Sequence, residues 1–298
     1  MNRSKTPLLV RDPRDWQRRC LEARERGAAI ALVPTMGFLH DGHVSLMREA
    51  RARADALAAA RPAGGGEALA VASIFVNPSQ FGPTEDLARY PRDLEGDLAK
   101  CAAAGIDAVL APDAAAVYGA RHQTWVDVTG VSQGLCGGSR PGHFRGVATV
   151  VAKLFNLTRP HVALFGEKDF QQLAVIRAMA RDLDMAVDVV GMPIVREPDG
   201  VAMSSRNAYL SPDDRRRAVA LSRALVDARD RVTSGERDAA ALIAAAKETL
   251  AAAGARVDYV EIVDPETLAP VQRAAPGSRM LVAAHVGATR LIDNAALP

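Results

Sequence analysis

Between residues 28 and 195, short apolar runs alternate with amphipathic stretches, which is the pattern of β-α units on a parallel sheet. The apolar runs predict buried strands over 28–33, 68–76, 106–110, 161–165 and 187–195. The amphipathic stretches carry apolar residues three or four positions apart and predict helices over 44–60, 93–104, 146–157 and 170–183. This alternation predicts an α/β domain built on a doubly wound parallel sheet.

The pattern changes after residue 195. Ser211-Pro212-Asp213 is typical of a helix start, with serine as N-cap and proline in the first turn, and this helix is expected to run to about residue 232. An alanine-rich helix over 239–253 ends before Gly254, and strands are expected over 257–263, 280–284 and 289–291. We therefore expect two domains, 1–194 and 195–298, of which the second is a smaller α+β unit.

Composition narrows the class of protein without changing this picture. The 298 residues are 49% hydrophobic and 24% charged, as in ordinary soluble globular proteins, which excludes disorder as the dominant state. The formal net charge of +2 argues against a surface made for nucleic acid or an anionic membrane. No apolar run approaches the ~18 residues of a membrane span. Three widely spaced cysteines without a C-x-x-C pair favour reduced thiols in the cytoplasm.

The first segment with candidate chemistry follows the strand over 28–33 and contains two histidines. It is the stretch Pro34-Thr35-Met36-Gly37-Phe38-Leu39-His40-Asp41-Gly42-His43. A strand end that leads into a helix start is a common site for anions, because the first helical N–H groups are unpaired. His40 and His43 could both face one phosphate chain, or they could be ordinary surface histidines. A metal site would need a third ligand, and no cysteine or histidine is spaced to supply one.

A second polar segment, Gly166-Glu167-Lys168-Asp169, ends the strand over 161–165. The lysine can supply an ammonium group for phosphate oxygens, and either acid could hold a divalent cation. One amide of Gln171-Gln172, which follow directly, could point into the same crevice.

Three more segments are weaker candidates. Met203-Ser204-Ser205-Arg206 offers two hydroxyls and a guanidinium as a phosphate clamp. Asn77-Pro78 predicts a turn that leaves Gln80 at the sheet edge, where its amide suits a hydroxyl or carboxylate ligand. The glycine-rich stretch 134–146 is either an anion-binding loop or a flexible connection, and 61–67 is expected to be an exposed loop.

Four of these five segments fall at the same edge of the predicted sheet, and that convergence favours a nucleotide or phosphate site. The P-loop and the G-x-G-x-x-G dinucleotide motif are both missing from the sequence.

Taken together, the segments resemble the pantothenate synthetase (pantoate–β-alanine ligase) family. The matching stretches, in order, are PTMGFLHDGH, FVNPSQFG, GSRPGHFRGVATVV, LFGEKDFQQL and MSSRNAYLS. The H-x-G-H element alone is shared with the wider nucleotidyltransferase superfamily. Phe38 departs from the small residue or asparagine usual in the family, and the 61–67 stretch is longer than usual, so local packing behind the first segment is left open.

The resemblance implies a Rossmann-like N-terminal domain, a C-terminal lid domain and a cytoplasmic homodimer that binds neither nucleic acid nor membrane. Its small-molecule substrates would be pantoate, β-alanine and ATP, with Mg²⁺. ATP would be bound by Pro34, Thr35, Met36, Gly37, His40, Gly42, His43, Gly166, Glu167, Lys168, Asp169, Val195, Met203, Ser204, Ser205 and Arg206. Pantoate would be held by Gln80 and Gln172, with Gln80 also beside β-alanine.

His43 stands at the position of the family's catalytic histidine, and we assign His40 and Lys168 with it as donors to the charge that develops on phosphate. The family adenylates the pantoate carboxylate, and β-alanine then displaces AMP. Two other interpretations stay open at this stage. One is a nucleotidyltransferase that stops at an adenylylated product, and the other is a nucleotide-sensing module without turnover.

Overall fold

The computed structural model describes residues 6–61, 66–83 and 85–298. The chain divides into two compact units. The first comprises Met1–Val128, Arg140–Gly166 and Val175–Met192, and the second comprises Thr129–Ser139, Glu167–Ala174 and Pro193–Pro298. The second unit thus includes two short segments from the part of the chain before residue 193. Residues 62–65, within the loop expected over 61–67, lie outside the described residues.

The first unit contains a parallel sheet with strands in the order β1-β4-β3-β2-β5-β6. The strands are β1 (Leu8–Val10), β2 (Ala29–Thr35), β3 (Ala68–Ile74), β4 (Ala108–Leu110), β5 (Val162–Gly166) and β6 (Asp188–Met192). From β2 the chain proceeds to β3 and β4 on one side and continues at β5 and β6 on the other, so the predicted doubly wound, Rossmann-like sheet is confirmed. The direction switches between β2 and β5, where sheets of this kind bind ligands beyond their carboxyl ends.

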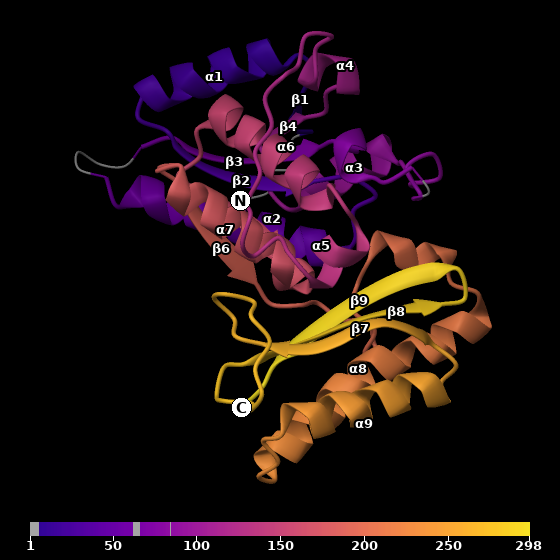
Figure 1. The fold of residues 1–298 in the computed structure, drawn as a ribbon. Helices are drawn as coiled ribbons and strands as arrows, with labels where there is room; N and C mark the ends of the chain where they lie inside the picture. Colours follow the sequence, from indigo (N-terminus) through magenta and orange to yellow (C-terminus); the bar gives the residue numbers. More distant parts are fainter. Residues whose placement is uncertain (1–5, 62–65, 84) are drawn as a thin grey trace. The chain divides into compact units, whose positions relative to one another are not determined.

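Helices cover this sheet on both faces, and the central strand β2 is therefore buried from Ala29 to Val33. The helices of this unit are α1 (Pro13–Glu25), α2 (Asp41–Ala59), α3 (Leu94–Ala103), α4 (Ala114–Val117), α6 (His143–Thr158) and the part of α7 (Phe170–Asp182) from Val175 onward. The short helix α5 (Leu135–Ser139) belongs to the second unit. On one face, Met47 of α2 packs in a cluster with Ala31 and Val33. Elsewhere, α1 and α6 lie side by side (Figure 1), joined by the Trp16 indole, which donates to Thr158 Oγ1 at 3.0 Å.

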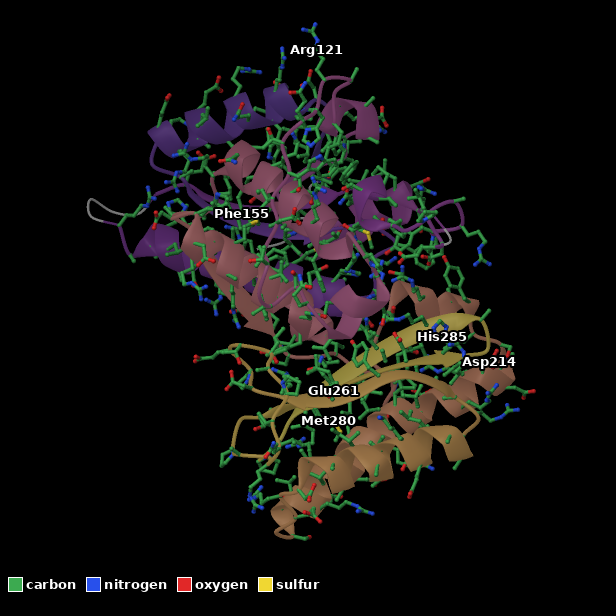
Figure 2. The ribbon with its side chains drawn as sticks, in the orientation of Figure 1. Arg121, Phe155, Asp214, Glu261, Met280 and His285 are labelled. Atoms are coloured by element: carbon green, nitrogen blue, oxygen red, sulfur yellow. The ribbon has the colours of Figure 1, made fainter. Side chains whose placement is uncertain are left out.

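Phe155 of α6, labelled in Figure 2, packs edge to face with Phe165 of β5 at a ring separation of 6.4 Å. The elements that were not foreseen include β1, α1 and the short helices α4 and α5. The buried residues of α1 are Trp16, Cys20 and Ala23, which stand at helical spacing, but the helix has few other apolar residues to make that spacing visible. Asp12 caps this helix and Pro13 starts it. Helix α2 begins three residues earlier than expected, because His40 acts as its N-cap.

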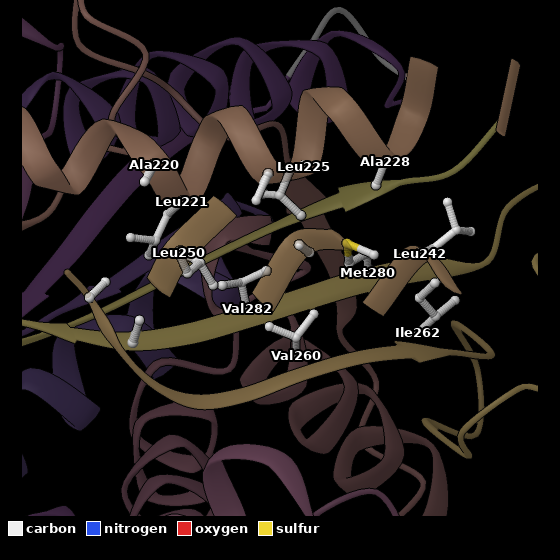
Figure 3. Packing of buried hydrophobic residues seen from close by; sticks show 14 of the residues in the cluster. Ala220, Leu221, Leu225, Ala228, Leu242, Leu250, Val260, Ile262, Met280 and Val282 are labelled. Carbon is white, nitrogen blue, oxygen red and sulfur yellow. The ribbon is translucent and has the colours of Figure 1, made fainter. Parts of the chain in front are cut away.

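The second unit contains an antiparallel sheet in the order β7-β8-β9, with α8 (Pro212–Thr233) and α9 (Ala239–Ala252) packed on it. Its strands are β7 (Arg256–Val263), β8 (Arg279–Val286) and β9 (Thr289–Ala296). Figure 3 shows the buried cluster of this unit, in which Leu225 of α8 and Leu250 of α9 contribute beside Val282 of β8. The smaller α+β domain expected after residue 195 is therefore present. No described helix combines the length and the apolar character that a membrane crossing requires.

Candidate active site

The turn after β2 is tight and its geometry requires glycine. Thr35 Oγ1 donates to Ser73 O at 2.7 Å and accepts from Gly37 N at 3.2 Å. Gly37 has φ +86°, and a Cβ there would lie 2.9 Å from Ile74 Cγ2 and 3.0 Å from Asp97 Oδ2. A side chain at Gly37 would therefore clash as well as strain the backbone.

Asp97 of α3 holds the next two residues of this turn. Its carboxylate accepts from Phe38 N at 2.8 Å and from Leu39 N at 2.7 Å, and the residue is 1% exposed. Phe38 has φ +51°, a left-handed conformation that asparagine tolerates better than phenylalanine. Burial raises the pKa of Asp97, although the two N–H groups oppose that shift. Sequence reasoning missed Asp97. The one available signal was that an acidic residue stands on the buried side of the expected 93–104 helix.

His40 and His43 lie together at the start of α2, with ring centroids 4.1 Å apart. His40 Nδ1 accepts from Gly42 N at 3.2 Å, and His43 Nδ1 accepts from His40 N at 3.3 Å, which forms a capping box. Because each Nδ1 accepts a hydrogen bond, the proton of each neutral ring belongs on Nε2. The N-terminus of α2 thus presents two imidazole N–H donors, as expected for a group that binds phosphate.

Gln80 lies in the 3₁₀ turn η1 (Pro78–Gln80) that follows β3. It is 8% exposed; its Oε1 accepts from Asn77 Nδ2 at 3.0 Å, and its Nε2 lies 3.2 Å from Met36 Sδ. Asn77 Nδ2 also donates to Gly146 O at 3.2 Å. A Cβ on Gly146 would lie 2.3 Å from Ser79 O, so the backbone of α6 packs directly on η1. The predicted pantoate ligand Gln80 is therefore beside the first segment and on a rigid support.

The ion pair between Arg140 and Glu85 supports the η1 turn through His143. Arg140 contacts both oxygens of Glu85, at 2.8 and 2.6 Å, and its NH1 lies 3.0 Å from His143 Nε2. His143 Nδ1 in turn lies 2.9 Å from Gln80 O, to which it donates. Burial opposes ionisation of Glu85, but Arg140 outweighs it, so the pKa of Glu85 lies below its ordinary value. Part of the glycine-rich 134–146 stretch is thus helical or held by specific contacts, rather than a plain connection.

In the second unit, Asn294 of β9 holds the turn that carries Lys168. Its Nδ2 donates to Glu167 O at 2.9 Å and to Lys168 O at 3.0 Å, and the residue is 2% exposed. Its Oδ1 accepts from Arg279 Nε at 2.8 Å, while Arg279 NH2 pairs with the Glu167 carboxylate at 2.8 Å. Glu167 is therefore engaged by an arginine, and Asn294 is a functional candidate that no sequence motif indicated.

The serine-rich loop lies in the same unit. Met203 N donates to Val195 O at 3.0 Å, which brings these two predicted residues together. Ser204 Oγ accepts from Arg206 N at 3.2 Å and caps η3 (Ser205–Tyr209). Lys168, Ser204 and Asn207 line one small hollow, and the buried Oδ1 of Asn207 has no hydrogen-bond partner within the described residues. The hollow brings the predicted lysine and a predicted serine to one place.

Of the two neighbouring glutamines, Gln171 has a structural role. It is buried, its Nε2 donates to Val131 O and Gly134 O at 3.1 and 3.2 Å, and its Oε1 accepts from Cys136 N. Gln172, the predicted pantoate ligand, is half-buried on the first turn of α7.

The predicted site residues divide between the two units. The first unit contains Pro34, Thr35, Met36, Gly37, His40, Gly42, His43, Gln80 and Gly166, all at or after the carboxyl ends of β2, β3 and β5. The second contains Glu167, Lys168, Asp169, Gln172, Val195, Met203, Ser204, Ser205 and Arg206. Among the described residues, no three His, Cys, Asp or Glu side chains are grouped as a metal site.

Comparison with known proteins gives consistent matches over nearly the whole chain. The family model described as "Pantoate-beta-alanine ligase" matches residues 8–296. A pantothenate synthetase of Anaeromyxobacter dehalogenans is 71% identical over 295 residues, which are 99% of this chain and 100% of that protein. The crystal structure of pantothenate synthetase from Thermus thermophilus has a TM-score of 0.86 at 45% identity and covers 98% of this chain and 100% of that one.

A more distant solved structure contains ligands. It is the pantoate-beta-alanine ligase of Francisella tularensis complexed with beta-gamma ATP and beta-alanine, with a TM-score of 0.75 at 27% identity and 97% of both chains covered.

Proposed function

Because this chain belongs to the pantoate-beta-alanine ligase family, we propose that it condenses pantoate with β-alanine at the expense of ATP to give pantothenate. The observation that carries this proposal is the family match over residues 8–296, which includes every segment of the candidate site. The ATP and β-alanine in the Francisella tularensis structure support the same substrates here. This is a carbon–nitrogen ligase activity.

We propose that the reaction passes through an acyl-adenylate. A carboxylate is a poor acyl donor, because oxide would have to leave. One carboxylate oxygen of pantoate attacks the α-phosphorus of ATP and pyrophosphate departs. The amine of β-alanine then attacks the acyl carbon, and AMP leaves with the transferred oxygen. Water must be kept from this intermediate until the amine arrives.

The groups of the first unit suit the nucleotide and the acid. The imidazole N–H groups of His40 and His43 can donate to phosphate oxygens as charge develops there. The buried amide of Gln80 suits the hydroxyl or carboxylate of pantoate. We propose that His43 stabilises the charge on the transferring phosphate, with His40 beside it.

The groups of the second unit suit phosphate oxygens. We propose that Lys168 neutralises charge on the leaving pyrophosphate, with Ser204, Ser205 and Arg206 as further donors. ATP would enter as its magnesium complex. Glu167 pairs with Arg279, and Asp169 Oδ2 lies 3.7 Å from Lys168 Nζ, so both carboxylates of this turn have a cationic partner. We propose that the metal would be held mainly by phosphate oxygens, with the more exposed Asp169 as the carboxylate that would join them.

We further propose that the protein acts as a cytoplasmic homodimer. Its three cysteines are free and buried, as suits a reducing compartment. Sedimentation equilibrium should give the mass of two chains at micromolar concentration. A single-chain mass at all concentrations would contradict the dimer and leave the ligase activity untouched.

The reaction is tested by incubating the protein with pantoate labelled with ¹⁸O in its carboxylate, together with β-alanine, ATP and Mg²⁺. We expect pantothenate, pyrophosphate and AMP that carries one ¹⁸O. Formation of ADP would exclude the adenylate route. A stable nucleotide product made without the amine would favour a nucleotidyltransferase, and ATP binding without any AMP would favour a sensing module.

A further inference from the structure

Two arginines, Arg24 and Arg61, face His161 at the amino-terminal edge of the sheet, the edge opposite the candidate nucleotide site of the first unit, and a third, Arg159, precedes that histidine by two residues. Arg24 lies in the last turn of α1, Arg61 follows α2, Arg159 follows α6, and His161 precedes β5. Arg24 NH1 lies 2.5 Å and Arg61 NH2 3.1 Å from His161 Nε2. At about 3.3 Å per residue, the length of β2 separates this edge from the turn at Gly37 by roughly 20 Å.

The imidazole of His161 faces more donors than it can accept. Its Nδ1 accepts from Ile30 N at 3.0 Å, so in the neutral ring the proton belongs on Nε2. That same Nε2 faces two guanidinium groups, which can only donate. Moving the proton to Nδ1 only transfers the conflict to Ile30 N–H. A group that accepts several hydrogen bonds would remove the conflict by taking the guanidinium N–H groups that the ring cannot accept.

The cluster also lacks compensating negative charge. Within the described residues, none of the three arginines forms an ion pair, whereas nearby Arg26 pairs with Glu67 at 3.1 Å. The neighbouring segment 62–65 is Pro-Ala-Gly-Gly and contributes no acid. Burial lowers the pKa of Arg24, and the charges of Arg159 and Arg61 lower it further. Burial and the charges of Arg24 and Arg61 also lower the pKa of His161.

We propose that Arg24, Arg61, Arg159 and His161 form a binding site for a phosphate group, separate from the site of the ligase reaction. A tetrahedral phosphate oxyanion offers acceptors to two guanidinium forks and one imidazole N–H, and its charge offsets the repulsion among the arginines. Arg24 and Arg61 are half-buried and Arg159 is exposed, so an anion can reach the cluster from solvent. The site uses the arginine that begins the 61–67 stretch, whose role the ligase reaction does not explain.

The competing explanation is that the arginines only complement the carboxyl ends of α1 and α6, where cations are favoured. The two explanations differ in what phosphate does. If the arginines only cap helices, their removal destabilises the protein without altering its response to phosphate. If they form a site, their removal abolishes that response.

The test is isothermal calorimetry of the full chain with inorganic phosphate and with glycerol 3-phosphate, at constant ionic strength set with chloride. The variants are Arg24→Gln and the exposed Arg159→Gln, and Arg26→Gln is the matched control because that arginine has its own acid. We expect saturable binding that weakens about tenfold or more in Arg24→Gln and Arg159→Gln and is unchanged in Arg26→Gln. Tighter binding of one probe than the other identifies free phosphate or a phosphate monoester as the ligand.

A second arm separates this site from the nucleotide site. In Lys168→Ala we expect the same phosphate affinity as in the wild-type protein. Equal phosphate binding by wild type, Arg24→Gln and Arg159→Gln would overturn the proposal, and so would loss of binding in Lys168→Ala. Neither result bears on the ligase activity, which the ¹⁸O experiment tests.

Discussion

At the residue scale, Asp97 and Asn294 each hold a backbone turn that carries candidate catalytic groups. Asp97 accepts from two N–H groups next to His40, and Asn294 donates to the carbonyl oxygens of Glu167 and Lys168. Neither side chain is exposed by more than 2%. Such residues fix the backbone of the segments that carry His43 and Lys168, without themselves having to touch substrate.

The first prediction concerns the two donor side chains, His43 and Lys168. His43→Ala and Lys168→Ala should each slow pyrophosphate release by at least about tenfold, because loss of a preorganised donor raises the barrier to adenylation. Rates are measured with saturating pantoate, and thermal melts check that the fold is intact. Wild-type rates in either variant would remove that residue from the mechanism.

Asn294→Asp gives the second prediction. The substitution keeps an oxygen for Arg279 but removes the N–H groups that hold the carbonyl oxygens of Glu167 and Lys168. We expect kcat to fall about tenfold, because the backbone that carries Lys168 loses its support. A tenfold fall corresponds to the free energy of about one or two lost hydrogen bonds. Asn156→Asp, at an exposed residue, is the matched control. A change in melting temperature with kcat unchanged would assign Asn294 a purely structural role.

At the element scale, the packing of α6 on η1 decides where Gln80 lies. The contact is backbone to backbone, since a Cβ on Gly146 would lie within 2.7 Å of both Ser79 O and Gln80 N. Neither backbone can move aside as a flexible side chain could. A side chain at Gly146 would therefore force the helix or the turn to shift.

Gly146→Ala should therefore displace η1. We expect a loss of about 1–3 kcal/mol in the free energy of unfolding and a rise in the KM for pantoate larger than that for ATP. Gly138→Ala, where a Cβ meets nothing within 4 Å, is the control for the change of residue type. An unaltered pantoate KM in a folded Gly146→Ala protein would argue against Gln80 as a pantoate ligand.

At the scale of the whole molecule, the Arg140–Glu85 pair links stability to pH. The folded state lowers the pKa of Glu85 below its ordinary 4.5, because Arg140 outweighs the effect of burial. Such a group stabilises the fold above the unfolded pKa, and the contribution disappears as pH falls through the lower folded value.

We therefore expect the wild-type protein to be more stable than Glu85→Gln above the ordinary pKa of 4.5, and the difference to shrink as pH falls below it. Urea unfolding over this range measures it. Glu25→Gln, at an exposed residue with no ion pair within the described part of the chain, is the control. A difference that stays constant with pH would show that the pair does not couple ionisation to folding.

Two predictions about the two units of the molecule also concern this scale. That the C-terminal domain closes over bound nucleotide as a lid stays a prediction. That the donors of the first unit and those of the second bind one ATP molecule also stays a prediction. The rates of pyrophosphate release in His43→Ala and Lys168→Ala address it.

The sequence by itself determined most of the elements and the segments that carry chemistry. Apolar periodicity and end signals such as Ser211 before α8 and Gly254 after α9 act within a few residues, so they are visible without a structure. The strand ends that carry His43 and Gln80 followed from the same local pattern.

Only the tertiary structure decided which side chains support those segments. Asp97 meets Leu39 across 58 residues and Asn294 meets Lys168 across 126, and no local pattern encodes such pairs. The polar helix α1 depends in the same way on packing against α6, 142 residues away at its tryptophan contact. Local order comes from backbone hydrogen bonding and side-chain periodicity, whereas buried polar partners are fixed by how distant elements pack, because each buried polar group must be satisfied wherever the fold places it.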